Sequence, residues 1–301
     1  MTVEQPGDDE RLSGPIKASF RFEYWALRSV DWLLGRMSVD RASALMGWIW
    51  RTVAPHLHRH PRAEANLTLA MPHLSAKERR SILLDSWENL GRTAAEALRI
   101  EEIAADRSRF TLSLEPIRHL MAKSHEGAVF ASLHQGNWEL AGFGIRAAGW
   151  NVAGVYRPLK NPLTEAFVLS RRRGVYNAGL FGRERSSALR LRTIARQGAA
   201  IGMLADLRDP GGIHVDFFGA PAPVTTYPAV LARRLKLPLI AGRVIRAEGV
   251  RFRVEAVEIE VPFTDDVDAD IVAATHALHR QYEAWIRSEP RQWMWAHRKG
   301  I

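Results

Sequence analysis

Hydrophobic residues follow one period in the first third of the chain and another in the rest. From about residue 17 to residue 103 they recur every three or four positions, the spacing that collects them on one face of an α-helix. Three prolines divide this region into separate helices, and Ser75 with Glu78 makes a capping box that predicts a further helix start. The first hundred residues are therefore expected to be helical after a polar tail.

From about residue 110, short apolar runs alternate with stretches of helical period. The segments that predict strands are 128–133, 152–156, 199–204, 238–242 and the alternating stretch 251–261. The helices expected between and after them lie near 138–148, 162–173, 186–197, 225–236 and 267–287. Alternation of this kind favours an α/β fold with a largely parallel or mixed central sheet flanked by helices.

The sequence contains no internal repeat and no glycine- or serine-rich linker. We therefore expect one α/β domain that carries an N-terminal helical extension. The expected boundaries are a polar, flexible tail at 1–16, a helical region at 17–103 and the α/β domain at 104–301.

The segment from Phe20 to Met37 is the most apolar part of the helical region. Its apolar residues follow helical steps with Trp25 and Trp32 beside them, while the charged residues lie elsewhere on the wheel. Tryptophan rings suit a lipid interface, so the segment predicts an amphipathic helix on a membrane surface. A helix that docks on the protein's own core is the alternative. The sequence shows no uninterrupted apolar stretch of the roughly 18 residues that predict a spanning helix.

The composition adds a charge and two exclusions to this picture. The 301 residues carry a formal net charge of +9 and include 10 tryptophans, which suggests a partner that is anionic and partly apolar. Nucleic acid and a lipid surface both fit that description. The chain has no cysteine, which excludes a disulfide framework and any Cys-ligated metal site. No helix-turn-helix, zinc or aromatic ribonucleoprotein motif supports nucleic acid as a partner.

The most informative segment follows the first predicted strand. That strand is expected to end at His134, Gly136 permits a tight turn, and Asn137 is a good N-cap for the next helix. Catalytic side chains in open α/β sheets lie at such strand ends. Glu139 could accept a hydrogen bond from one imidazole nitrogen, which leaves the other free to take a proton from a hydroxyl. Alternatively, His134 only caps the helix and Glu139 is favoured there by the helix dipole.

Other candidate residues lie at neighbouring strand ends or in a basic region. Arg157 and Asp206 each follow a predicted strand, so they either line the same cleft or form a structural ion pair. The densest basic region comprises Arg171, Arg172, Arg173, Arg183, Arg185, Arg190, Arg192 and Arg196. Arginine pairs two phosphate oxygens at once, so this region predicts a surface for lipid phosphates or an acidic carrier protein. A solvated helix face is the alternative.

The run at 127–139 resembles the His-x4-Asp/Glu motif of the lysophospholipid-acyltransferase-like superfamily. Its His-Gln-Gly-Asn-Trp-Glu form is similar, more narrowly, to that of the lipid A biosynthesis (late or secondary) acyltransferases. Further matches follow in family order at 156–162, 206, 216–219, 231–234 and 290–299, and the N-terminal helices match around 64–67 and 72. The resemblance covers about residues 20–299, and several ordered elements are far more specific than one motif.

One departure from the family pattern bears on the expected site. Leu207 stands where the family usually has a glutamine after Asp206, which puts in doubt how that loop contacts substrate. Other departures, at 227–228 and 291, leave the histidine motif unchanged.

The resemblance implies an O-acyltransferase that moves a fatty acyl chain from acyl carrier protein to a hydroxyl of a lipid A precursor, a phosphorylated glycolipid. His134 would be the general base, oriented by Glu139. Substrate-binding residues are expected among Gly136, Asn137, Arg157, Asp206, Arg171, Arg172 and Arg173. Arg157 and backbone amides near Gly136 are candidates to stabilise the oxyanion. No metal and no cofactor is expected, and the N-terminal helix would hold the enzyme at the cytoplasmic face of the cell inner membrane.

Two other functions stay open on the sequence. An acyltransferase for another glycolipid, such as a phosphatidylinositol mannoside or an aminolipid, would carry the same motifs. A membrane-associated relative that kept the fold without catalysis is the alternative of a different class.

Overall fold

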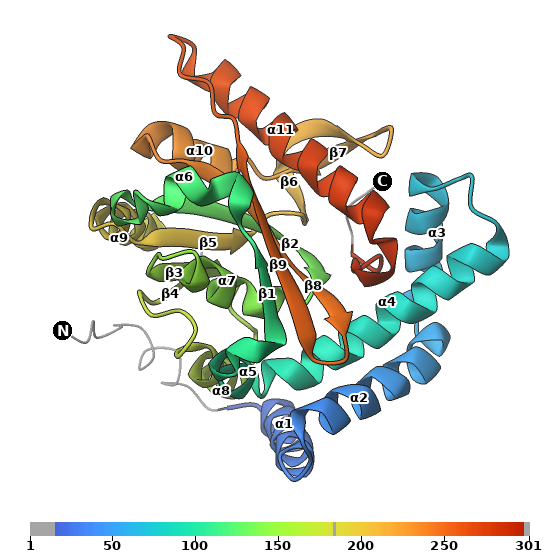
Figure 1. The fold of residues 1–301 in the computed structure, drawn as a ribbon. Helices are drawn as coiled ribbons and strands as arrows, with labels where there is room; N and C mark the ends of the chain where they lie inside the picture. Colours follow the sequence, from blue (N-terminus) through green and yellow to red (C-terminus); the bar gives the residue numbers. More distant parts are fainter. Residues whose placement is uncertain (1–15, 183–184, 298–301) are drawn as a thin grey trace.

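The computed structural model describes residues 16–182 and 185–297 (Figure 1). Its α-helices are α1 (Ala18–Leu34), α2 (Val39–Val53), α3 (His60–Ala70), α4 (Ala76–Ala97), α5 (Ile100–Ala105), α6 (Arg118–Met121), α7 (Ala141–Ala147), α8 (Pro162–Arg172), α9 (Arg185–Arg196), α10 (Tyr227–Leu235) and α11 (Val267–Ser288). Its strands are β1 (Phe110–Ser113), β2 (Ala128–Gly136), β3 (Val152–Tyr156), β4 (Leu180–Gly182), β5 (Ala200–Leu204), β6 (Arg208–Phe217), β7 (Ala220–Val224), β8 (Leu239–Glu248) and β9 (Arg251–Ile259). Short 3-10 helices are η2 (Ala54–His56), η3 (Arg107–Arg109), η4 (Glu115–Ile117), η5 (Ser124–Glu126), η6 (Trp138–Leu140) and η7 (Pro290–Gln292).

The central sheet has seven strands in the order β1-β9-β8-β2-β5-β3-β4. Its pairs are parallel except β8 with β9, so β1 and β9 run against the other five strands. This arrangement confirms the expected α/β fold with a largely parallel, mixed sheet. All five strands predicted from the sequence are present, and the helices expected between and after them form as α7 to α11.

Four strands were not predicted, and their sequences explain why. β1 and β4 are only 4 and 3 residues long, too short to show a period. β6 and β7 form a separate antiparallel hairpin. β6 begins with the polar, glycine-containing stretch 208–212, and β7 contains two prolines, so neither shows the pattern of a buried strand.

Both faces of the sheet are covered, and β2 shows how one strand serves two cores. Val129, Ala131 and Leu133 belong to the core beneath α10 and α11, whereas Ala128 and Phe130 belong to the core on the opposite face. Figure 1 shows α10 and α11 on the first side and α7 on the other. A strand buried on both faces reads as a continuous apolar run, which is why β2 was recognisable in the sequence.

The N-terminal helices pack along one end of this sheet. The long helix α4 begins with the predicted capping box of Ser75 and Glu78 and packs against α2 (Figure 1). α1 contacts α8, where Asp31 accepts a hydrogen bond from Arg171 at 2.8 Å. The division at residues 16 and 103 stays a prediction, and most of the expected tail (1–15) lies outside the described residues. No helix in the described part of the chain is long and apolar enough to cross a membrane.

Candidate active site

Parallel pairing brings three strand ends to one edge of the sheet. β5 lies between β2 and β3, and all three strands run in the same direction. His134 near the end of β2, Asp206 just after β5 and Arg157 just after β3 are therefore neighbours at this edge. The sequence analysis placed each of them at a strand end, and the sheet order decides which of them meet.

His134 and Asp206 form a hydrogen-bonded pair. Oδ1 of Asp206 lies 2.7 Å from Nδ1 of His134, and Oδ2 accepts from the backbone N–H of His134 at 2.9 Å. An ionised carboxylate only accepts hydrogen bonds, so Nδ1 carries the proton and Nε2 keeps its lone pair. The His134 side chain is 12% exposed and lines a cavity, where Nε2 can act as a base.

Asp206 is completely buried, and the end of the chain helps to hold it. Nε1 of Trp293 donates to Oδ2 of Asp206 at 2.9 Å. The backbone N–H of Met294 donates to the carbonyl of His134 at 3.0 Å, and Gln135 forms a β-bridge with Trp293. Trp293 and Trp295 are both fully buried, and Trp293 also orients the partner of His134.

The structure corrects the predicted partner of His134, which is Asp206 and not Glu139. Both carboxylate oxygens of Glu139 accept from Arg172 on α8, at 2.7 and 2.8 Å. Five residues of separation suggested a local contact, but the first helical turn directs Glu139 toward α8. The carboxylate that reaches the imidazole comes from the neighbouring strand end, 72 residues away.

Helix α4 fixes the turn at the end of β2 by hydrogen bonds to Gly136. Gly136 has φ of +62°, and a Cβ there would lie 1.9 Å from the carbonyl oxygen of Val244, so only glycine fits. The carbonyl of Gly136 accepts from Asn89 Nδ2 at 2.8 Å and from Thr93 Oγ1 at 3.1 Å. Asn137 caps η6 through the N–H of Glu139, as predicted.

Gly136 and Asn137 were expected to touch substrate, and the structure gives them a different place. Both are buried, and neither lines the cavity. Nδ2 of Asn137 donates at 2.7 Å to Glu96, whose carboxylate also forms a two-bonded ion pair with Arg246. These residues fix the turn that carries His134.

Of the predicted substrate-binding arginines, Arg157 and Arg172 line the cavity, and Arg172 is also in an ion pair. Arg157 is exposed, lines the cavity and forms no ion pair among the described residues. Arg171 pairs with Asp31, and Arg172 pairs with Glu139. Burial disfavours the charge of Arg172, but Glu139 outweighs it, and the pKa of the guanidinium is raised.

The remaining basic residues lie on or near α9. Arg190, Arg192 and Arg196 are exposed on that helix. Arg183 lies outside the described residues, and of Arg185 only the backbone is described. A role of Arg171, Arg172 and Arg173 in substrate binding stays a prediction.

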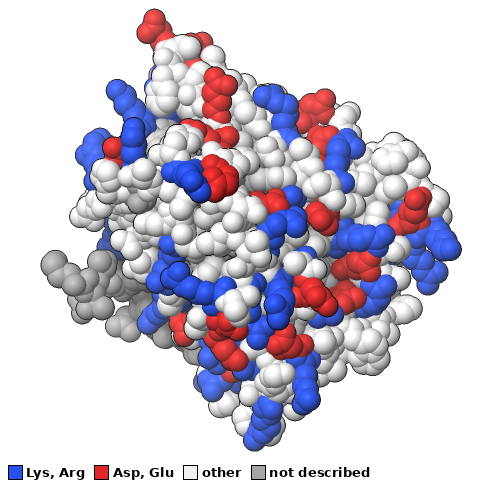
Figure 2. Space-filling model, in the orientation of Figure 1, with Lys and Arg blue, Asp and Glu red and all other residues white. Residues whose placement is uncertain are grey.

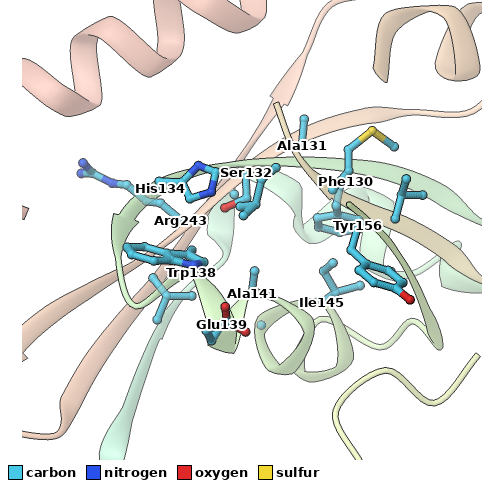
Figure 3. A pocket seen from close by; sticks show the side chains of 18 of the residues that line it. Phe130, Ala131, Ser132, His134, Trp138, Glu139, Ala141, Ile145, Tyr156 and Arg243 are labelled. Atoms are coloured by element: carbon cyan, nitrogen blue, oxygen red, sulfur yellow. The ribbon is translucent and has the colours of Figure 1, made fainter. Parts of the chain in front are cut away.

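A cavity of about 310 Å³ extends from His134 under α7 (Figure 3). This volume lies at the lower end of the roughly 300–1,000 Å³ typical of ligand sites. Its polar mouth carries His134, Glu139 and Arg157, while its interior is lined by apolar side chains such as Phe130 and Ile145. Burial and the charge of Glu139 raise the pKa of Tyr176 in its wall to about 12, so that phenol is neutral at physiological pH.

The space for this cavity comes from small residues on one face of the sheet. Gly242 of β8 is paired with Ser132 of β2 on one side and with Ala256 of β9 on the other. On the other side of β2, Phe130 is paired with Gly202 of β5, which is paired in turn with Gly154 of β3. Gly242 leaves open space, since a Cβ there would meet its nearest atoms at 3.8 and 4.0 Å. Gly154 and Gly202 instead let Tyr176, Leu180 and Ile145 pack close to the sheet. The resulting cavity between the sheet and α7 is lined mostly by apolar side chains.

His297 lies close to the pair, with its ring centroid 4.4 Å from that of His134. Ligand atoms of His134, Asp206 and His297 all lie within 4.8 Å of one another, which is a donor set that a divalent cation can use. The Asp206 oxygens accept from N–H groups, which is the arrangement of an oriented general base. The sequence expectation of no metal stays a prediction.

A histidine–carboxylate pair beside a largely apolar cavity is an arrangement that an enzyme acting by general-base catalysis can use. Over residues 12–299 the chain matches the family described as bacterial lipid A biosynthesis acyltransferase, and it belongs to that family. It is therefore an acyltransferase that acylates a lipid, as the resemblance of its motifs implied.

Two curated relatives are similar over much of the chain. Both are phosphatidylinositol mannoside acyltransferases, from two strains of Mycobacterium tuberculosis. Each is 28% identical over 222 residues, which cover 70% of this chain and 68% of the relative. The matches extend the comparison to acyltransferases whose acceptor is a different glycolipid.

The corrected pairing of His134 makes a direct prediction. We expect Asp206→Asn to lower kcat for acyl transfer about 10³- to 10⁴-fold, because an amide cannot accept both from Nδ1 and from the two N–H groups on Oδ2. Glu139→Gln breaks the ion pair with Arg172, so we expect it to lower the melting temperature and to change kcat much less than Asp206→Asn does. Steady-state kinetics and thermal denaturation of both variants check this. An equal loss of kcat in the two variants would restore Glu139 as the partner.

Proposed function

We propose that the protein transfers a fatty acyl chain from acyl carrier protein to a hydroxyl of a lipid A precursor, a step of lipopolysaccharide biosynthesis. The observation that carries the proposal is the His134–Asp206 pair at the mouth of an apolar channel. Family membership supplies the reaction class. The acceptor and the donor are the parts that need experiments.

The reaction follows from the position of His134. The thioester lies at the mouth with its acyl chain in the channel. Nε2 of His134 takes the proton of the acceptor hydroxyl as the hydroxyl oxygen attacks the thioester carbonyl carbon. The carbon–sulfur bond then breaks, and His134 returns the proton to the thiolate. Asp206 stabilises the imidazolium between the two steps.

Charge at the mouth supports anionic substrates. Arg157 and Arg208 are exposed there, and neither forms an ion pair among the described residues. Lys160 and the exposed arginines of α9 add positive charge to the surface but do not line the cavity. A glycolipid phosphate and an acidic carrier protein both fit such a surface. Figure 2 shows Lys and Arg mixed with Asp and Glu on the face in view, so there the surplus of +9 is not one continuous patch.

A phosphatidylinositol mannoside is the second candidate for the acceptor. It is favoured by the two relatives, which are phosphatidylinositol mannoside acyltransferases. Both candidate acceptors are glycolipids with phosphate, and the mouth offers the same arginines to either of them.

The donor and acceptor can be tested together. Purified protein is incubated with acyl carrier protein loaded with chains of different length, and with either a tetra-acylated lipid A precursor or a phosphatidylinositol mannoside. We expect acylation of the lipid A precursor, measured by mass spectrometry, and its loss in His134→Ala. Transfer only to the mannoside would assign the second acceptor. Transfer to neither would overturn the proposal, and equal transfer by His134→Ala would overturn the mechanism.

Gly242 provides a test of the channel. A Cβ at this position meets its nearest atoms at 3.8 and 4.0 Å, so alanine fits without strain. A leucine side chain would extend into the cavity. We therefore expect Gly242→Ala to keep the wild-type preference for acyl length and Gly242→Leu to shift it to shorter chains, measured by competition between donors. An unchanged preference in Gly242→Leu would place the acyl chain elsewhere.

We also propose that α1 attaches the enzyme to the cytoplasmic face of the inner membrane. One face of α1 docks on the protein through Tyr24, Leu27 and Leu34. The opposite face exposes large apolar side chains, namely Phe22, Trp25, Val30, Trp32 and Leu33. Trp48 of α2 is likewise exposed. The inner face of α1 thus docks on the protein itself, as one interpretation of the sequence expected. The outer face suits a lipid interface, as the other expected.

Vesicle flotation tests this attachment. We expect Trp25→Glu combined with Trp32→Glu to reduce binding to vesicles that contain anionic lipid, because two charges would enter the apolar layer. Leu189→Glu is the matched control, since Leu189 is 72% exposed but lies on α9. Wild-type binding by the double variant, or an equal loss in the control, would exclude α1 as the specific anchor.

A further inference from the structure

The hydroxyl of Ser132 is buried and makes no hydrogen bond within the described residues. Ser132 is only 6% exposed, and its Oγ has no partner. A buried hydroxyl without a partner loses its bonds to water and gains nothing in return. Native proteins rarely keep such a group unless a ligand or a functional role completes it. Serine at this position therefore calls for an explanation beyond packing.

Ser132 faces the channel beside His134. The two residues are separated by two positions on β2, so their side chains share one face of the sheet, and both line the cavity. Figure 3 shows Ser132 next to His134 on the cavity wall. The residue paired with Ser132 on β8 is Gly242, which has no side chain to cover the hydroxyl. The open hydroxyl thus lies where the apolar channel meets the base.

We propose that Ser132 Oγ–H donates a hydrogen bond to the thioester carbonyl oxygen and stabilises the oxyanion. When the acceptor oxygen attacks the carbonyl carbon, the electron pair of the C=O bond moves onto the carbonyl oxygen. The proton of the acceptor hydroxyl goes to Nε2 of His134. The carbonyl then re-forms, the carbon–sulfur bond breaks and the thiolate takes the proton from His134. Ser132 only donates a hydrogen bond and forms no covalent bond with the acyl group.

Two backbone amides of the turn that carries His134 already donate hydrogen bonds within the protein. Its Asn137 N–H donates to the carbonyl of Val244 at 2.8 Å, and its Glu139 N–H donates to the side chain of Asn137 at 3.1 Å. Those amides are therefore engaged, although the sequence analysis considered this turn as an oxyanion site. Arg157 lies exposed at the mouth, whereas Ser132 lies inside the site, where water is excluded and a donor is more effective.

The test is Ser132→Ala, which removes the hydroxyl and leaves a side chain that fits the same space. We expect kcat for acyl transfer to fall about 10²- to 10³-fold with little change in KM. The melting temperature is expected to stay the same or rise, because the lost group has no partner in the free protein. A purely structural role would predict the opposite pattern, with lower stability and unchanged kcat.

Thr164→Val is the matched control. Thr164 on α8 is 7% exposed and also has a buried hydroxyl without a partner among the described residues, but it does not line the cavity. This variant should keep or raise the melting temperature and keep the wild-type kcat. A similar loss of kcat in both variants would show that the effect is not specific to the position of Ser132, and would overturn the inference.

The inference rests on the proposed acyl transfer, and the wild-type enzyme and His134→Ala separate the two. No transfer by the wild type overturns the proposed function itself. Transfer that is lost in His134→Ala and retained in Ser132→Ala overturns only the role of Ser132. An acyl group found on Ser132 by mass spectrometry of the intact protein would make this residue a nucleophile and would also overturn the proposal.

Discussion

The buried carboxylate of Asp206 is the interaction on which the site depends. Its two oxygens accept from the ring and the backbone of His134 and from the indole of Trp293. Asp206 is fully buried, and a buried carboxylate is stable only when several hydrogen-bond donors surround it. Those donors come from β2 and from Trp293, which follows η7, while Asp206 itself follows β5. The active centre therefore forms only when the whole domain has folded around it.

A second buried charge connects the N-terminal helices to the same place. Glu96 of α4 is 1% exposed and accepts from Ser43 of α2, Asn137 and Arg246. Asn89 and Thr93, on the same helix, bind the carbonyl of Gly136. α4 is thus a structural support of the turn that holds His134. The N-terminal helices and the edge of the sheet that carries His134 are joined through α2 and α4.

Small residues from several strands line the cavity. Gly242 and Ala256 on one side of Phe130, and Gly202 with Gly154 on the other, belong to four different strands. Each of them reads locally as an ordinary strand residue. Only the assembled sheet places Gly242 beside Ser132, where the missing side chain leaves the hydroxyl uncovered.

The sequence by itself determined the buried strands, the helices between them and the candidate base. Buried strands read as continuous apolar runs, so β2, β3, β5 and β8 were predictable, and the ordered motifs identified the family and His134. What only the tertiary structure decided was the partner of His134. A spacing of five residues pointed to Glu139, but strand order is a long-range property, and it places Asp206 on the imidazole and leaves Glu139 to Arg172. Periodicity reports which face of an element is buried, whereas contacts between strand ends depend on how the sheet is assembled.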